Sequence, residues 1–200
     1  MKIGLCGTMS VGKTTLIKEL SKLPQFKDFS AVTERSKYLN SLGIPLNHKT
    51  TIEGQTIFLA ERVTELMQPN LLTDRTVIDV MAFTECAIHT SVIDADAFIE
   101  YARRFVSQYD YIFYIPPEGI DIKDNGIRET DATYRKEIDE SIQKLLLKYR
   151  PVYFTIKGST EERIKQILKT INHKNNEIME MGFGCIGSFR WHSSYRKHTK

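Results

Sequence analysis

The chain has 200 residues, of which 41% are hydrophobic and 26% charged, and its net charge is +3. This length suits one compact domain, and only 11 glycines and 6 prolines exclude a collagen-like or disordered chain. No apolar run approaches the roughly 18 residues of a membrane span, and no secretory signal is visible at the N-terminus. The three cysteines lack paired spacing. We therefore expect free thiols in a cytoplasmic, intracellular protein without a membrane partner.

Short apolar segments typical of strands alternate along the chain with segments of helical period. Strands are predicted at 2–6, at 30–34, within 70–79, at 109–115 and at 151–156. Helices are predicted at 13–23, 53–68, from the third strand to about His89, and at 94–107, 132–149 and 159–172. This alternation predicts an α/β fold of three layers, with a five-stranded parallel sheet flanked by helices.

The spacing of apolar residues predicts which helix faces are buried. The inward residues of 13–23 are expected to be Leu16, Ile17, Leu20 and Leu23. Those of 53–68 are expected to be Ile57, Phe58, Ala60, Val63 and Met67. Ser159 and Glu162 form a capping-box signature at the start of the last helix. One boundary is predicted, which separates a domain of residues 1–173 from a tail of residues 174–200.

The last 19 residues are basic and aromatic. Residues 182–200 contain no acid, and their positive charge exceeds the net charge of the whole chain. Their basic and aromatic members are Arg190, Arg196, Lys197, Lys200, Phe183, Phe189, Trp191 and Tyr195. Such a mixture can bind a polyanion and stack on its bases, which makes DNA a candidate partner. The alternative is a solvated tail whose aromatic residues pack back on the domain.

The most specific motif runs from Gly7 to Thr14 and matches G-x-x-x-x-G-K-[ST], between a predicted strand and a predicted helix. In such a loop the glycines let backbone N–H groups turn towards phosphate oxygens, at a helix N-terminus that favours anions. Lys13 would place a charge between the β- and γ-phosphates, and the Thr14 hydroxyl would bind Mg²⁺. ATP and Mg²⁺ are therefore the expected cofactors. The predicted nucleotide-binding residues are Gly7, Thr8, Met9, Ser10, Val11, Gly12, Lys13, Thr14 and Thr15.

Charged residues follow two further strands. Ligands of open α/β sheets bind at the carboxyl ends of the strands, where Glu34 and Arg35 could orient an acceptor hydroxyl and an acceptor phosphate. The alternative for this pair is a surface ion pair. A carboxylate of the Mg²⁺ shell is expected after the third strand. It is Asp74 if the strand ends at Thr73, or Asp79 if the strand is 76–78, and the sequence leaves this choice open.

Three motifs in this order resemble those of the thymidylate kinase family. They are Val-Thr-Glu-Arg at 32–35, Phe-Leu-Ala-Glu-Arg at 58–62, and Thr-Asp-Arg followed by Ala-Phe at 73–83. The Asp-Arg-x₃-Asp form at 74–79 is also similar to that of the ribosylnicotinamide kinases. The resemblance covers about residues 1–170 and implies a P-loop kinase fold. It also implies that Glu34 lies by the acceptor, that Arg62 lines its pocket, and that Asp74 and Arg75 handle the metal and the transferring phosphate.

One departure bears on the acceptor. Thymidylate kinases usually carry Arg-Glu-Pro after the second strand, where this chain has Glu34, Arg35 and Ser36. This change, the small size and the basic aromatic tail resemble viral DNA kinases related to thymidylate kinase that act on 5-hydroxymethyluridine. Two acceptors therefore stay open. One is a free nucleoside or nucleoside monophosphate, and the other is a 5-hydroxymethyl-pyrimidine in DNA.

The segment 123–131 contains Asp-x-Gly-x-Arg, which resembles the lid of these kinases. Arg128 of this segment and Arg135 could close over the γ-phosphate and stabilise transition-state charge, whereas the alternative is a solvated turn. Gly158 and Ser159 are a candidate adenine-side loop. We expect Lys13, Glu34, Arg75 and Arg128 to be catalytic, and the acceptor to be bound by Glu34, Arg35, Arg62, Arg75, Asp79 and Arg135.

The sequence thus predicts a P-loop kinase that transfers the γ-phosphoryl group of ATP to a nucleoside-like acceptor. The guanine-reading Asn-Lys-x-Asp motif of GTPases is not supplied by residues 172–175, which read Asn-His-Lys-Asn. A nucleotide-dependent binding module or switch is the alternative from another class. Acceptor-side and lid arginines favour the kinase, because a switch does not need them.

Overall fold

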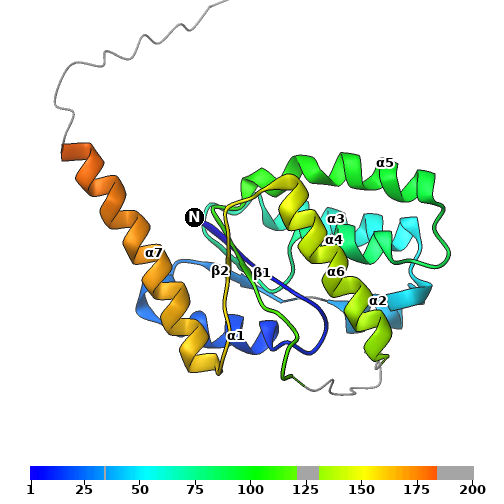
Figure 1. Ribbon diagram of the computed structural model, residues 1–200, viewed down its shortest axis with the longest axis horizontal. Helices are drawn as coiled ribbons and strands as arrows, with labels where there is room; N and C mark the ends of the chain where they lie inside the picture. Colours follow the sequence, from blue (N-terminus) through cyan, green and yellow to red (C-terminus); the bar gives the residue numbers. More distant parts are fainter. Residues whose placement is uncertain (34, 121–130, 184–200) are drawn as a thin grey trace, which may run out of the picture.

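The computed structural model describes residues 1–33, 35–120 and 131–183, with side chains up to residue 173. Five parallel strands form one sheet of order β2-β3-β1-β4-β5 (Figure 1). They are β1 (Lys2–Cys6), β2 (Ser30–Val32), β3 (Leu71–Thr73), β4 (Tyr111–Tyr114) and β5 (Tyr153–Thr155). The predicted five-stranded parallel sheet is therefore confirmed, and each strand lies within its predicted range.

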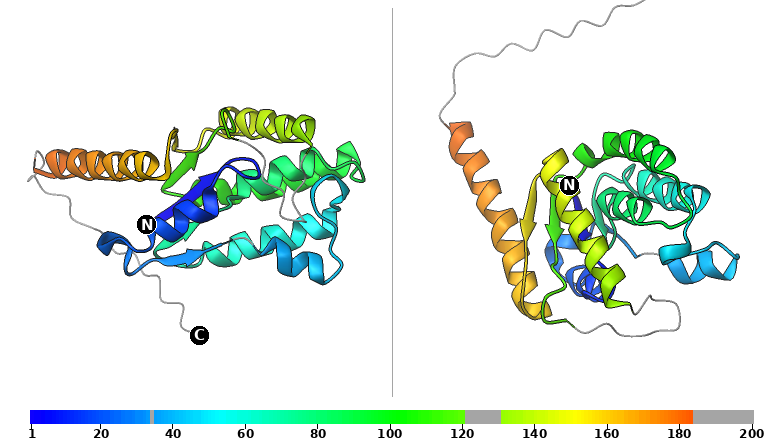
Figure 2. Two further views of the ribbon diagram at one scale, coloured as in Figure 1. Left: turned by 90° about the horizontal axis from the view of Figure 1, so that it is seen from below. Right: turned by 45° about the vertical axis from the view of Figure 1, so that its right-hand side comes forward.

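Helices follow the strands and cover both faces of the sheet (Figures 1 and 2). The α-helices are α1 (Lys13–Leu20), α2 (Ser36–Ser41), α3 (Ile52–Glu65), α4 (Val77–Glu85), α5 (Val92–Ala102), α6 (Ala132–Tyr149) and α7 (Thr160–Phe183). Three short 3₁₀ helices complete the described part, namely η1 (Pro24–Phe26), η2 (Asn47–Lys49) and η3 (Arg103–Gln108). Together these elements form the three layers that the sequence predicts.

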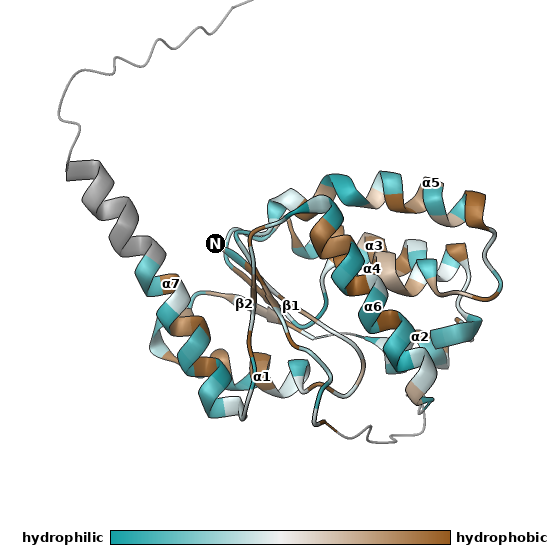
Figure 3. Cartoon of the chain, viewed as in Figure 1, coloured by the Kyte–Doolittle hydropathy of each residue, from teal (hydrophilic) through white to brown (hydrophobic). Residues whose placement is uncertain are grey.

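The sheet separates two hydrophobic cores, since side chains alternate between the two faces of a strand. On one face, Ile3 and Leu5 of β1 pack with α1 and with Ile167 of α7. On the other face, Cys6 of β1 packs with residues of α3, α4, α5 and α6. Figure 3 shows that the surrounding helices mix hydrophilic and hydrophobic residues, as expected for helices that cover a core.

Gly4 of β1 lets the start of α4 approach the sheet closely. A Cβ atom at this position would lie 2.4 Å from Cγ2 of Thr76, which precedes α4. A side chain at residue 4 would therefore push the N-terminus of α4 away from the loop that follows β1. This contact positions the site, because Asp79 of α4 binds that loop.

Three features differ from the sequence-based expectations. The predicted inward face of 53–68 is confirmed at Phe58 but wrong at Ile57, Ala60 and Met67, which are exposed, Met67 lying beyond the end of α3. Gln55 and Arg62 are buried instead. Helix α2 and η2 were not predicted. Helix α7 extends past the predicted helix end at residue 172 to Phe183, and residues 184–200 of the basic tail lie outside the described residues.

No helix in the described ranges is long and apolar enough to cross a bilayer.

Candidate nucleotide and acceptor site

The loop from Gly7 to Gly12 joins β1 to α1 and has an unusual backbone. Three of its residues have positive φ, with 151° at Gly7, 63° at Ser10 and 87° at Gly12. A Cβ atom at Gly7 would lie 2.6 Å from the carbonyl oxygen of Ile115, so that no side chain fits there. The motif glycines therefore stand where the backbone requires them, which is the geometry of a phosphate-binding loop.

Lys13 folds back onto this loop. Its ammonium group donates hydrogen bonds to the carbonyl oxygen of Gly7 and, at 2.8 Å, to that of Thr8. The Nζ atom also lies 4.0 Å from Oδ1 of Asp79. The side chain is buried, so the positive charge is held within the loop rather than extended into solvent.

Thr14 and Asp74 lie together at the carboxyl end of the sheet. The Thr14 hydroxyl donates a 2.5 Å hydrogen bond to Oδ2 of Asp74, which follows β3 directly. A hydroxyl and a carboxylate are the hard oxygen donors that Mg²⁺ prefers, usually together with phosphate oxygens and water. The residues present therefore fit a magnesium ion bound beside the loop.

Asp79, the other carboxylate considered for the metal, has a different environment. It is fully buried in the first turn of α4, where Oδ2 accepts hydrogen bonds from the backbone N–H and the hydroxyl of Thr76. Its Oδ1 accepts a 3.0 Å hydrogen bond from the backbone N–H of Gly7. Asp79 thus holds the start of the phosphate loop. A direct contact with the acceptor stays a prediction from the sequence.

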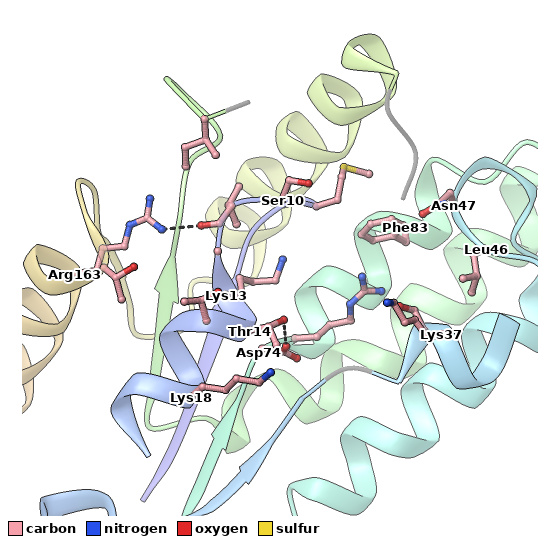
Figure 4. A pocket seen from close by; sticks show the side chains of 18 of the residues that line it. Ser10, Lys13, Thr14, Lys18, Lys37, Leu46, Asn47, Asp74, Phe83 and Arg163 are labelled. Carbon is pink, nitrogen blue, oxygen red and sulfur yellow. Dashed lines mark hydrogen bonds between the residues drawn. The ribbon is translucent and has the colours of Figure 1, made fainter. Parts of the chain in front are cut away.

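A cavity of about 700 Å³ extends along the loop (Figure 4). This volume falls within the range of small-molecule sites. The phosphate loop lies between two ends of this cavity, one against α2, α3 and α4 and the other against the start of α7. The lining residues are Met9, Ser10, Val11, Gly12, Lys13, Thr14, Thr15, Lys18, Ser36, Lys37, Leu46, Asn47, Gln55, Phe58, Asp74, Arg75, Phe83, Ile120, Gly158, Ser159, Thr160 and Arg163.

The end of the cavity against α3 and α4 is aromatic and contains a buried amide. The Arg75 guanidinium lies 4.7 Å from the ring centroid of Phe83 and 5.5 Å from that of Phe58. Gln55 is 2% exposed, and its amide nitrogen donates a 2.8 Å hydrogen bond to the Thr50 hydroxyl. The amide oxygen of Gln55 is buried without a hydrogen-bond partner among the described residues.

The opposite end is formed by the first residues of α7. Gly158, Ser159 and Thr160 line it, which brings the candidate adenine-side loop to the cavity. The predicted capping box is confirmed, since Glu162 accepts from the Ser159 N–H at 2.7 Å and the Ser159 hydroxyl accepts from the Glu162 N–H at 3.3 Å. Arg163 then donates from Nη1 to the carbonyl oxygen of Val11 at 2.7 Å.

Comparison with known proteins agrees with this geometry. Residues 2–163 match the family described as AAA domain. The chain belongs to the AAA domain family. The match begins with β1 and ends at Arg163, so it includes the phosphate loop and both ends of the cavity. No curated protein shows significant sequence similarity to this AAA domain.

Solved structures similar to this AAA domain show that it has a P-loop kinase fold. Deoxyadenosine kinase from M. mycoides, bound to dCMP and dCDP, has a TM-score of 0.62 at 18% identity, and the match covers 86% of this chain and all of that one. NadR in complex with NR has a TM-score of 0.61 at 18% identity, over 78% of this chain and 45% of that one. YorR from Bacillus subtilis, bound to phosphorylated GDP, scores 0.61 at 15% identity, over 88% and 98%.

Arg135 of this AAA domain lies beside the phosphate loop. Its Nε donates a 3.3 Å hydrogen bond to the Thr8 hydroxyl, and its Nη1 donates a 2.6 Å bond to the carbonyl oxygen of Ile120. One residue earlier, the Tyr134 ring lies 3.5 Å from that of His48, centroid to centroid. Helix α6 therefore contacts both the phosphate loop and the segment between α2 and α3.

The remaining predicted site residues are separated from the cavity or lie outside the described residues. Arg62 is 1% exposed, donates to Glu65 and is not among the residues that line the cavity. Arg35 is half exposed, with Nη1 3.6 Å from Oε1 of Glu61. Glu34 and Arg128 fall among the residues whose placement is not described.

Sequence reasoning missed Gln55 and Arg163 as residues of the site, whereas Phe83, which also lines the cavity, is the last residue of the acceptor-side motif at 73–83. Gln55 lies on α3, which meets α4 only in the folded chain, and none of the sequence motifs includes it. Arg163 carried a usable signal. It is a basic residue in the first turn of the helix that follows β5. That helix begins at the same edge of the sheet as the phosphate loop.

Proposed function

We propose that this chain is a kinase that transfers the γ-phosphoryl group of ATP to a nucleoside-like acceptor. The observation that carries this proposal is a single cavity with two unlike ends and the phosphate loop between them. A nucleotide switch needs only the loop and the end against α7. The second end, which is lined by Gln55, Phe58 and Phe83, suits another planar molecule that carries hydrogen-bonding groups.

The comparisons support this assignment at the level of the fold. The M. mycoides neighbour is a deoxyadenosine kinase, and NadR was solved with NR bound. Both proteins share the overall fold of this chain at 18% identity. Nucleotide binding by the loop is also what membership of the AAA domain family favours.

The residues beside the loop can supply what phosphoryl transfer requires, which is positioning and charge rather than covalent catalysis. Lys13 would stabilise the negative charge of the β- and γ-phosphates. Thr14 and Asp74 would hold Mg²⁺, which neutralises phosphate charge when bound. Arg75, which lines the cavity next to Asp74, would stabilise the transferring group. From the sequence motifs, we propose that Glu34 accepts the proton of the acceptor hydroxyl and that Arg128 closes over the phosphates.

The acceptor end suits a nucleobase or a similar heterocycle. Phe58 and Phe83 offer apolar ring surface, and the buried amide of Gln55 offers a hydrogen bond that water cannot easily satisfy. A free nucleoside, a nucleoside monophosphate and a 5-hydroxymethyl-pyrimidine in DNA all present such a ring. Of these three acceptors, only DNA would also be bound by the basic tail of residues 182–200, because the tail can neutralise phosphate charge.

Transfer of labelled γ-phosphate from ATP to a panel of acceptors tests the proposal. The panel contains nucleosides, their monophosphates, and duplex DNA with and without 5-hydroxymethyluracil. We expect one class to stimulate ATP consumption and to carry the label. ATP hydrolysis that no acceptor stimulates, with label only in inorganic phosphate, would favour the nucleotide switch instead.

The variant Gln55→Leu locates the acceptor. Loss of the amide should lower kcat/KM for the acceptor about ten- to a hundredfold, as expected for a buried hydrogen bond to a substrate, with KM for ATP unchanged. Gln68→Leu is the matched control, because Gln68 is exposed and does not line the cavity. Equal kinetics for both variants would remove the aromatic end of the cavity from the acceptor site.

A further inference from the structure

Helix α7 contributes one side chain to the phosphate loop, across 152 positions of sequence. Nη1 of Arg163 donates a 2.7 Å hydrogen bond to the carbonyl oxygen of Val11, the residue before Gly12 at the end of the loop (Figure 4). Arg163 is 8% exposed, and its Nε is buried without a hydrogen-bond partner among the described residues. A charged group is thus buried against the loop, where it makes a charge-assisted hydrogen bond.

The start of α7 is fixed on both sides of Arg163. Before it, the Ser159–Glu162 capping box fixes the first turn. After it, Ile167 and Ile171 are buried in the same core as Leu16 of α1. Because the helix is anchored at both places, the position of the Arg163 guanidinium relative to the phosphate loop is fixed.

The loop is shaped to receive this side chain. A Cβ atom at Gly12 would lie 3.4 Å from Nη1 of Arg163, so the guanidinium lies directly beside the second motif glycine. Gly12 has a φ of 87° and is the residue that turns the chain into α1. A bond at the Val11 carbonyl therefore acts on the peptide whose N–H belongs to Gly12.

We propose that Arg163 is a positioning residue for the phosphates of the nucleotide, acting through the Val11–Gly12 peptide. Two effects follow from a cation on that carbonyl. It fixes the orientation of the peptide, and it polarises the peptide so that the N–H of Gly12 becomes a stronger donor. The positive charge itself also lies beside the cavity, where it attracts the triphosphate. The inference rests on the nucleotide-binding half of the proposed function and is independent of the acceptor.

Two other roles for Arg163 make different predictions. If the guanidinium only stacks on the base of the nucleotide, its loss should weaken the binding of adenosine and of ATP by the same factor. If it only anchors α7, its loss should lower the melting temperature and leave the affinity for ATP unchanged. If Arg163 positions the phosphates, its replacement should lower the affinity for ATP but not the affinity for adenosine.

The experiment measures dissociation constants for ATP, ADP and adenosine by calorimetry in the full chain and in Arg163→Met. Methionine keeps the apolar stem of the side chain and removes the charge and the donors. We expect the affinity for ATP to fall about ten- to a hundredfold, the size expected for a hydrogen bond to a charged group. The affinity for adenosine should change less than about threefold.

Two further variants complete the test. Arg163→Lys retains the charge and should recover most of the affinity for ATP, even if Arg163→Met is too unstable to measure. Lys169→Met removes an exposed charge from the same helix and should have no effect. An equal fall in the affinities for ATP and for adenosine, in either Arg163→Lys or Arg163→Met, overturns the inference. So does unchanged ATP affinity in folded Arg163→Met. Failure of the wild type to bind ATP would instead overturn the proposed function together with the inference.

Discussion

The Thr14 hydroxyl and Oδ2 of Asp74 lie 2.5 Å apart and join the first turn of α1 to the end of β3. These two oxygens come from neighbouring strand ends, which is where ligands of an open α/β sheet bind. The contact explains why β3, a strand of only three residues beside β1, is part of the site. It also predicts how the protein responds to magnesium.

Replacement of Asp74 with Asn should raise the Mg²⁺ concentration needed for half-maximal phosphoryl transfer. The amide is a neutral and weaker ligand for a hard cation, so we expect a shift of at least about tenfold. Titration of activity with Mg²⁺ at saturating ATP measures it. Asp110→Asn is the control, since Asp110 is exposed, does not line the cavity, and its carboxylate accepts a hydrogen bond from the N–H of Lys2. A magnesium curve for Asp74→Asn that coincides with the wild-type curve would exclude Asp74 from the metal shell.

Replacement of Lys13 with Met should lower kcat by about 10²-fold or more, because a preorganised charge at the phosphates is lost. The structure adds a second expectation. Since the ammonium bonds two loop carbonyls, its loss should also destabilise the empty protein by about 1–2 kcal/mol. Steady-state kinetics and urea unfolding separate these effects. Activity of a folded Lys13→Met protein within threefold of wild type would contradict the assignment of the loop.

Much of the fold could be predicted because the pattern of its strands is local. Each strand is a short apolar run, and the loop motif fixes where the first strand ends and the first long helix begins. The capping box at Ser159 could be predicted for the same reason, since both of its partners lie within four residues. These signals do not depend on what the rest of the chain does.

Helix α3 shows why the site itself was harder to predict. Hydrophobic spacing predicts that Ile57 and Met67 face inward, yet both are exposed. The inward face instead carries Gln55 towards the cavity and Arg62 towards Glu65. Polar residues occupy buried positions there, so a rule that equates burial with apolar character finds Phe58 but misplaces the rest of the buried face.

The choice between Asp74 and Asp79 shows a second limit. Both carboxylates follow the third strand, and the sequence cannot say which one the strand end presents. In the structure, Asp74 accepts a hydrogen bond from the Thr14 hydroxyl, whereas Asp79 accepts hydrogen bonds from the backbone N–H groups of Gly7 and Thr76. That difference depends on where a three-residue strand stops, and element ends are the least predictable feature of a sequence.

Replacement of Asp79 with Asn should destabilise the protein markedly. The carboxylate is fully buried and accepts from two backbone N–H groups and one hydroxyl. An asparagine amide would set a donor against one of these donors, which costs about 2–4 kcal/mol. Urea unfolding measures the loss. The exposed variant Asp110→Asn should cost less than about 1 kcal/mol, and an equally small cost for Asp79→Asn would show that this carboxylate does not hold the loop.

Glu65 provides a test that depends on pH. It lies between Arg62 and Thr73, whose hydroxyl donates to Oε2 at 2.9 Å. Burial is the main cause that raises the pKa of Glu65 to about 7, with Glu61 and Asp74 adding to it. Between its ordinary pKa near 4.5 and about 7, the folded protein therefore binds a proton that the unfolded chain does not. The free energy of unfolding must then fall as the pH rises through this window.

The variant Glu65→Gln removes this titration and keeps an acceptor for Arg62. Relative to the wild type, it should gain stability as the pH rises from 5 to 8. The gain should approach roughly 3 kcal/mol, since each unit of pKa shift corresponds to about 1.4 kcal/mol. Urea unfolding of both proteins at pH 5, 6, 7 and 8 measures the difference. A difference that stays constant across the series would show that Glu65 is ionised throughout. In that case its ion pair with Arg62 outweighs the burial of the carboxylate.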